Sequence, residues 1–197
     1  IISLGANLGL KPRDVPLPLL ASAQVVLCQA ESDYATVTHV LRTARRNGAM
    51  TVFNPAPMRP EFDPAVLRHV EVVIPNESEF TALVKRCPPC AALLRSAPYN
   101  AGGEFTEATL QTLSGDALHR LCRCLQVPVV IVTLGARGCF VSQPDVYLRI
   151  HAHDVEVVDT AGAGDAFVGG FAAGIVKFRH NVFEAAHYAS AVAALSV

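Results

Sequence analysis

The stretch DTAGAGDAFVGG, residues 159–170, places two aspartates around a glycine-rich turn that leads into an apolar run. Gly162 and Gly164 allow the backbone to turn sharply and to approach a ligand closely. The apolar run predicts a helix, whose free N–H groups and dipole favour an anion at its amino end. Asp165 lies in the first turn of this helix, where a carboxylate can accept the proton of a hydroxyl that attacks a phosphate. The combination indicates phosphoryl transfer to an alcohol.

A plainer interpretation of Asp165 is an acidic residue that stabilises a helix terminus, an effect of a few tenths to about 1 kcal/mol. The stretch alone leaves this alternative open. Its pattern differs from a P-loop, because no Gly-Lys-Ser/Thr follows. It also differs from the dinucleotide-binding fingerprint, because the glycines are spaced differently.

Short β-branched runs alternate with longer helical patterns along the chain. This alternation predicts a three-layer α/β/α fold with a mostly parallel, Rossmann-like sheet, in a single domain over residues 1–197. In the helix after the glycine turn, Gly169, Gly170 and Gly174 indicate close packing against the sheet. Residues 85–115 mix Pro, Gly and Cys without a clear period, and we expect a surface loop or insertion there. The expected strands cover residues 1–6, 25–29, 50–54, 70–76, 127–135, 139–143 and 155–159, and the expected helices cover residues 11–21, 34–47, 64–68, 77–85, 114–125, 164–179 and 182–197.

Polar or glycine-rich residues follow several of these strands. Glu31 comes after the second expected strand, Asn54 ends the third, and Asn76 and Glu79 follow the fourth. The segment TLGARG, residues 133–138, comes after the apolar core of the fifth. Because parallel sheets bind ligands at the carboxyl ends of their strands, this shared position predicts a single site at one edge of the sheet.

Composition and charge argue against several classes of protein. The formal net charge is −1, from 16 basic and 17 acidic residues without a long basic run, so no nucleic-acid partner is expected. The apolar runs are too short to span a bilayer and no signal peptide opens the chain, so a cytoplasmic or nuclear protein without membrane contact is expected. The chain starts in a strand-like stretch and stops in a helix-like one, and we expect both ends to be cut from something longer.

Six cysteines raise the question of a zinc or redox site. The motifs CPPC, residues 87–90, and CRC, residues 122–124, are the candidates. CRC has a one-residue spacing, whereas structural zinc pairs use two or more. CPPC lies in a Pro-rich segment rather than at a strand-to-helix turn, where thioredoxin-type chemistry takes place. Free thiols are therefore the favoured interpretation.

The motifs DTAGAGDAFVGG, NPAP, PNESE and VTLGARG, together with QAES at residues 29–32, resemble the signatures of the ribokinase, or PfkB-type, family of sugar kinases. The resemblance implies a ribokinase-like fold whose amino-terminal lid portion is missing from this chain. It also implies transfer of the ATP γ-phosphate to the 5-hydroxyl of D-ribose, with Mg²⁺ and with K⁺ as an activating cation. Family members often dimerise through the lid, so a homodimer is expected for the full-length protein.

The same resemblance implies a role for each matching residue. Asp165 corresponds to the catalytic base, which also touches the sugar, and Glu31 to an acidic sugar contact. Asn76 and Glu79 correspond to a motif that organises Mg²⁺ and phosphate through water. Donors to the monovalent cation would be Asp159, Ala161 and Ser196. The implied ATP contacts, which include the anion hole at 162–164, are Asn76, Thr133, Leu134, Gly135, Ala136, Arg137, Gly138, Gly162, Ala163, Gly164 and Ser190.

Two alternatives to a ribose kinase stay open at this point. One is a kinase of the same family that acts on another sugar or on a nucleoside, because most sugar contacts of the family lie in the missing portion. The other is a truncated, inactive protein that binds nucleotide without turnover. The absent lid favours this second alternative, whereas the complete GAGD motif at residues 162–165 opposes it.

Overall fold

A six-stranded sheet forms the centre of the computed structural model, which describes residues 5–100 and 103–197. Strands β1 to β4 run parallel to one another, and β5 and β6 continue the sheet in antiparallel pairs. The order of the strands across the sheet is their order along the chain. The strands are β1 (Val25–Gln29), β2 (Met50–Asn54), β3 (Val72–Val73), β4 (Val129–Thr133), β5 (Cys139–Ser142) and β6 (Tyr147–Ile150).

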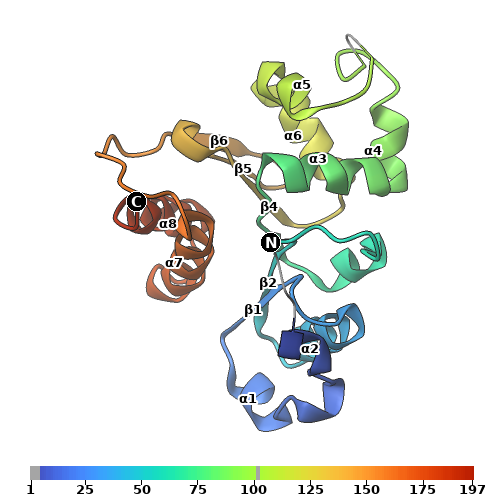
Figure 1. Ribbon diagram of the computed structural model, residues 1–197, viewed down its shortest axis with the longest axis vertical. Coiled ribbons are helices and arrows are strands. Elements are labelled where there is room, and N and C mark those ends of the chain that lie inside the picture. Colours follow the sequence, from blue (N-terminus) through green and yellow to red (C-terminus); the bar gives the residue numbers. More distant parts are fainter. Residues whose placement is uncertain (1–4, 101–102) are drawn as a thin grey trace.

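Helices cover both faces of this sheet, as Figure 1 shows, with α7 and α8 on one face and α2, α3 and α6 on the other. Neighbouring residues of β2 enter different cores: Val52 belongs to the core of Phe171, and Phe53 to the core of Leu41 and Phe80. Successive strand residues point to opposite faces, so both faces of the sheet are apolar. This arrangement confirms the predicted three-layer α/β/α fold. The helices are α1 (Leu17–Ser22), α2 (Tyr34–Arg46), α3 (Glu77–Arg86), α4 (Pro88–Leu93), α5 (Glu107–Thr112), α6 (Gly115–Cys124), α7 (Ala163–Lys177) and α8 (Val182–Ala194), with 3₁₀ helices η1 (Gly5–Gly9), η2 (Pro12–Asp14), η3 (Pro64–His69) and η4 (Gly135–Arg137).

Two glycines of α7, Gly170 and Gly174, pack against α8, not against the sheet as the sequence predicts. A Cβ atom added at Gly174 would lie 2.9 Å from the Cα atom of Ala185. One added at Gly170 would lie 3.0 Å from the Cβ atom of Val192, whereas one added at Gly169 would meet nothing within 4 Å. Gly170 and Gly174 therefore permit the close approach of the two helices, and Gly169 has no such role.

We expect Gly174→Ala to lower the free energy of unfolding by about 1–3 kcal/mol, because the added methyl group meets backbone that must move. Gly169→Ala is the matched control in the same helix and should raise the stability by up to about 1 kcal/mol, since alanine loses less backbone entropy. Urea unfolding of both variants measures the difference. Equal effects would show that Gly174 does not set the distance between the helices.

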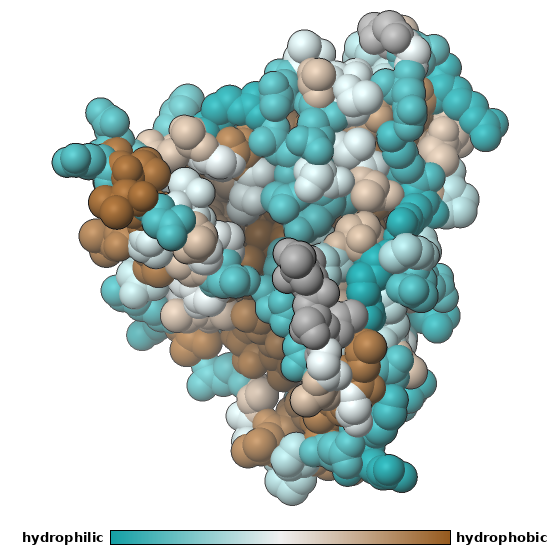
Figure 2. Space-filling view, viewed as in Figure 1, coloured by the Kyte–Doolittle hydropathy of each residue, from teal (hydrophilic) through white to brown (hydrophobic). Residues whose placement is uncertain are grey.

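One predicted strand lies mostly outside the described residues, and another differs from the structure. Residues 1–4 of the strand predicted at 1–6 lie outside the described residues, and the chain forms η1 directly after them. Residues 155–159 form no strand, and Val157 and Val158 are exposed. Figure 2 shows hydrophobic residues gathered over this segment between β6 and α7. An alternating pattern forms a strand only where a neighbour takes its backbone hydrogen bonds. Residues 155–159 do not pair with β6, the edge strand, and so have no such neighbour in the described part of the chain.

The segment 85–115 also differs from the predicted surface loop. It contains α4 and α5, and Cys90, Tyr99 and Phe105 are buried in the same core as Phe53. The hydroxyl of Tyr99 donates a hydrogen bond of 2.9 Å to the carbonyl oxygen of Ala117 in α6. The apolar residues are spaced too irregularly for a helical period, yet they pack against α6. None of the helices in the described part of the chain is both long and apolar enough to cross a membrane.

Candidate active site

A cavity of about 140 Å³ opens where the carboxyl ends of β2, β3 and β4 meet the amino end of α7. Parallel strands bring these ends together, and Asn76, just beyond β3, forms an isolated parallel bridge with Thr133 at the end of β4. The lining combines six residues that the sequence predicts for the site with Asn54 and three apolar neighbours. The lining residues are Asn54, Ala56, Ile74, Asn76, Glu79, Thr133, Gly162, Gly164, Asp165 and Val168.

The turn before α7 presents backbone donors to this cavity. Gly162 has a left-handed backbone (φ 81°), a conformation that favours glycine. The N–H group of Ala163 donates to the carbonyl oxygen of Thr160 at 3.2 Å, so it is already engaged. The N–H groups of Gly162, Gly164 and Asp165 have no acceptor among the residues that the structure describes. These three amides, together with the helix dipole, are therefore the donors available to an anion.

Asp165 lies at the mouth of the cavity with one carboxylate oxygen already bound. Its Oδ1 atom accepts a hydrogen bond of 2.6 Å from Nε2 of Gln29. From the sequence, Gln29 receives no role, although a sugar contact is predicted for Glu31, two positions further along the chain. It is the last residue of β1, and a polar side chain at the carboxyl end of a strand in this fold is the signal that could have found it.

Asn76 and Glu79 form a reciprocal cap at the start of α3. The Oδ1 atom of Asn76 accepts from the N–H of Glu79 at 2.8 Å, and Oε2 of Glu79 accepts from the N–H of Asn76 at 2.9 Å. Glu79 is only 8% exposed. This burial raises the pKa of the Glu79 carboxyl, the hydrogen bond from the Asn76 backbone lowers it, and the negative charge of Asp165 raises it further. Two carboxylates that face one cavity favour a cation between them.

These side chains fit a hydrated Mg²⁺ ion better than a dedicated metal cage. No group of three or more His, Cys, Asp or Glu side chains is placed to hold a metal ion within residues 5–100 and 103–197. Mg²⁺ keeps several of its waters and commonly binds through one or two carboxylates together with substrate phosphates. The carboxylate of Glu79, held beside Asn76 at the start of α3, can supply such a ligand, in part through water.

The raised pKa of Glu79 predicts a pH-dependent stability. A carboxyl whose pKa is higher in the folded state contributes stability at low pH, and this contribution is lost as the pH rises through the folded-state pKa. Glu79→Gln removes the buried charge and keeps an oxygen for the N–H of Asn76. We therefore expect the stability of the variant relative to the wild type to increase between about pH 4 and about pH 7.

Chemical unfolding of both proteins at the two pH values measures this change. The exposed glutamate in the first turn of α5 supplies the control, Glu107→Gln, which removes one negative charge without a buried partner. The explanation fails if Glu79→Gln and Glu107→Gln shift stability equally at both pH values.

The predicted nucleotide turn lies next to the cavity, at the end of β4. The N–H of Leu134 donates to the carbonyl oxygen of Gly138 at 2.7 Å and closes the turn around η4. Gly138 has a φ of 86°, and a Cβ atom there would lie 1.9 Å from the carbonyl oxygen of Ile150, so only glycine fits. Arg137 forms an ion pair with Glu77 at the start of α3. Gly135 and Ala136 are exposed on the turn, and Ser190 is buried in α8, outside the cavity lining.

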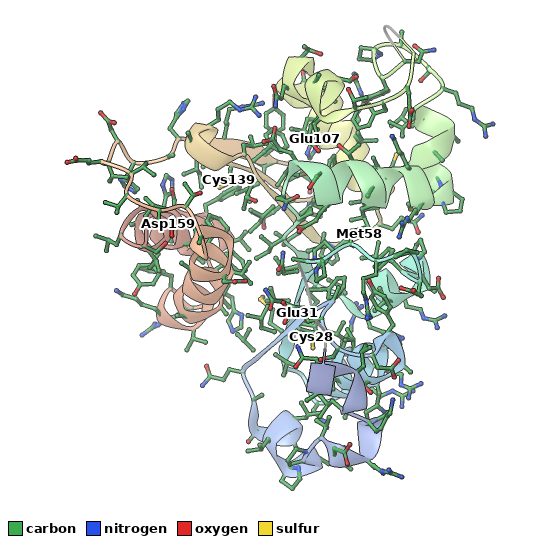
Figure 3. All side chains as sticks on the ribbon, viewed as in Figure 1. Cys28, Glu31, Met58, Glu107, Cys139 and Asp159 are labelled. Carbon is green, nitrogen blue, oxygen red and sulfur yellow. The ribbon has the colours of Figure 1, made fainter. Side chains whose placement is uncertain are left out.

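Glu31 lies in a second cavity, of about 380 Å³, between β1, α2 and η1. Its Oε2 atom accepts a hydrogen bond of 3.3 Å from Nδ2 of Asn7. Gln29 also lines this cavity, and its amide reaches Asp165 in the first cavity. Figure 3 shows Glu31 near the end of β1, well apart from Asp159 beside α7. The side chain of Gln29 therefore links the two cavities, because it lines the second and hydrogen-bonds to Asp165 in the first.

The residues predicted for a monovalent cation are engaged within their own segments. The Oδ1 atom of Asp159 accepts a hydrogen bond of 2.9 Å from the N–H of Ala161. The hydroxyl of Ser196 donates to the carbonyl oxygen of Ala193 at 2.7 Å. The K⁺ site stays a prediction. The six cysteines form no disulfide bonds with one another.

Comparisons with known proteins agree on one family. The model of the pfkB family carbohydrate kinases matches residues 1–197. The chain is 36% identical to the ribokinase of Mus musculus over 176 residues, which cover 87% of this chain and 48% of the mouse protein. The solved ribokinase of Thermotoga maritima is similar, with a TM-score of 0.78, 27% identity and coverage of 100% of this chain and 58% of that one.

A third similarity is to the solved ribokinase of Arabidopsis thaliana complexed with ribose and ATP. Its TM-score is 0.74 at 23% identity, and the match covers 99% of this chain and 57% of that one. This similarity supports the fold alone. The chain thus spans about half of the length of these relatives.

Proposed function

The chain belongs to the pfkB family of carbohydrate kinases, and we propose that the whole protein transfers the γ-phosphate of ATP to the 5-hydroxyl of D-ribose. One observation carries this proposal. The carboxylate of Asp165 and the unpaired amides at the start of α7 face the same cavity at the carboxyl ends of the strands. That arrangement places a proton acceptor beside an anion site.

The reaction needs positioning and charge stabilisation more than covalent help. The oxygen of the 5-hydroxyl attacks the γ-phosphorus, the bond from that phosphorus to the β–γ bridging oxygen breaks, and ADP leaves. Asp165 takes the hydroxyl proton on a carboxylate oxygen, while the amides of Gly162 and Gly164 stabilise the charge on the transferring phosphoryl group. When bound, Mg²⁺ would neutralise charge on the β- and γ-phosphates. Asn76 and Glu79 would hold it, in part through water.

A polar, hydroxylated sugar fits the second cavity. Asn7, Gln29 and Glu31 line it with amide and carboxylate groups that can hydrogen-bond to hydroxyls. The matched proteins named as ribokinases support ribose within the family. D-ribose between Glu31 and Asp165 would bring its 5-hydroxyl towards the base.

A panel of acceptors tests the proposal on the whole protein. We expect kcat/KM to be highest for D-ribose among D-ribose, 2-deoxy-D-ribose, D-fructose and adenosine, with ATP and Mg²⁺ held constant. The highest value for fructose or adenosine would assign the protein to another kinase of the same family.

A further inference from the structure

We propose that Gln29 is a positioning residue that holds the carboxylate of Asp165 for proton transfer. The inference rests on the proposed phosphoryl transfer and adds a residue to it. Nε2 of Gln29 donates to Oδ1 of Asp165 at 2.6 Å and also to Oδ1 of Asn54 at 3.0 Å. Nδ2 of Asn54 donates in turn to the carbonyl oxygen of Ile74 at 2.7 Å. A chain of hydrogen bonds thus runs across the ends of three neighbouring strands to the proposed base.

The carbonyl oxygen of Ile74 fixes which group donates in each of these hydrogen bonds. The carbonyl oxygen of Ile74 can only accept, so the side chain of Asn54 must turn its NH₂ group towards it. The oxygen of Asn54 then faces Gln29, which must present its own NH₂ group in return. That NH₂ group has two hydrogens, and the second points to Asp165. The hydrogen-bond network therefore fixes which terminal atom of Gln29 is nitrogen, and this nitrogen donates to the carboxylate of Asp165.

Asp165 needs such support because nothing else in the described residues orients its side chain. It is exposed, and its Oδ2 atom has no hydrogen-bond partner in the described part of the chain. Asn54 is 7% exposed and sits at the end of β2, so it provides a rigid anchor. Gln29 occupies one oxygen of Asp165 and leaves the other open to an incoming hydroxyl.

Gln29→Met keeps the size of the side chain and removes its donor. In the whole protein with ATP, Mg²⁺ and D-ribose, we expect kcat to fall roughly 10- to 100-fold, because small errors in the placement of a base are costly. The KM for ATP should stay within about 2-fold, since Gln29 lies on the sugar side of Asp165. Gln29→Glu keeps the shape but offers no donor at neutral pH, and it should lose at least as much.

The matched control is Gln24→Met, the same substitution at the residue that directly precedes β1. Gln24 is exposed and lies just before that strand, away from both cavities. Its kcat should equal that of the wild type. Equal losses in the Gln24 and Gln29 variants would overturn the inference, because they would indicate a general effect on β1.

A double-mutant cycle separates positioning from a merely structural role. If Gln29 acts through Asp165, Gln29→Met should change the residual kcat of Asp165→Asn by less than about 2-fold. A full 10-fold loss in that background would contradict the inference while the proposed function stands.

Crystal structures of the wild type and Gln29→Met supply a readout that does not depend on turnover. We expect one conformer of Asp165 in the wild type and several in the variant. A single, unchanged conformer in the variant would overturn the inference, even if no sugar is phosphorylated.

Discussion

Asp165→Asn is expected to lower kcat for D-ribose by roughly 10²- to 10⁴-fold, the usual contribution of a positioned general base. Asparagine keeps the shape of the side chain but cannot take the proton of the attacking hydroxyl. The affinity for ATP should survive, because the backbone donors of Gly162 and Gly164 and the turn after β4 are unchanged. Steady-state kinetics and calorimetric titration with ATP measure the two effects separately.

The control for Asp165→Asn is another acid in the first turn of a helix, Asp116 of α6. Asp116→Asn removes a comparable interaction with a helix dipole, worth up to about 1 kcal/mol of stability. It should leave turnover unchanged, because Asp116 lines neither cavity. If Asp165→Asn retains a kcat near that of Asp116→Asn, Asp165 is only a helix-terminus acid.

Gly164→Ala is expected to lower kcat by roughly 10²-fold without loss of stability. The removal of one oxyanion-hole donor typically costs 10²- to 10³-fold, and a methyl group at Gly164 would hold the phosphoryl group away from the amides. A Cβ atom there meets nothing within 4 Å, so the fold accommodates it. Helix propensity should even raise the free energy of unfolding by up to about 1 kcal/mol.

Gly169→Ala serves as the control for this variant, because it adds the same methyl group to α7 in open space and outside the cavity. Its stability should rise similarly and its kcat should not change. A Gly164→Ala protein with a normal kcat would place the transferring phosphoryl group away from the start of α7.

The site could be predicted from the sequence in large part because of how a parallel sheet is built. Asn76, Thr133 and Asp165 are far apart along the chain, yet each follows a strand or begins a helix at the same edge. Recognition of the strands was therefore enough to bring them together. The roles of these residues in binding and catalysis, by contrast, are tested only by the experiments above.

Other features depend on tertiary contacts that a single sequence does not reveal. The amide of Gln29 matters only because β1 lies beside β2 and α7 begins at the same edge of the sheet. This arrangement places Oδ1 of Asp165 at 2.6 Å from Nε2 of Gln29. The pattern of small residues in α7 predicts close packing but not whether the sheet or α8 is the partner. Residues 155–159 have the alternation of a strand, but they pair with no strand in the described part of the chain.

The most direct test of the central claim is identification of the product. The whole protein is incubated with ATP, Mg²⁺ and D-ribose, and the products are followed by ³¹P nuclear magnetic resonance. The account predicts one ribose 5-phosphate for each ADP formed. The account would be contradicted if the protein binds ATP but forms no sugar phosphate from ribose or from any of the other acceptors. That result would indicate a protein that binds nucleotide without turnover.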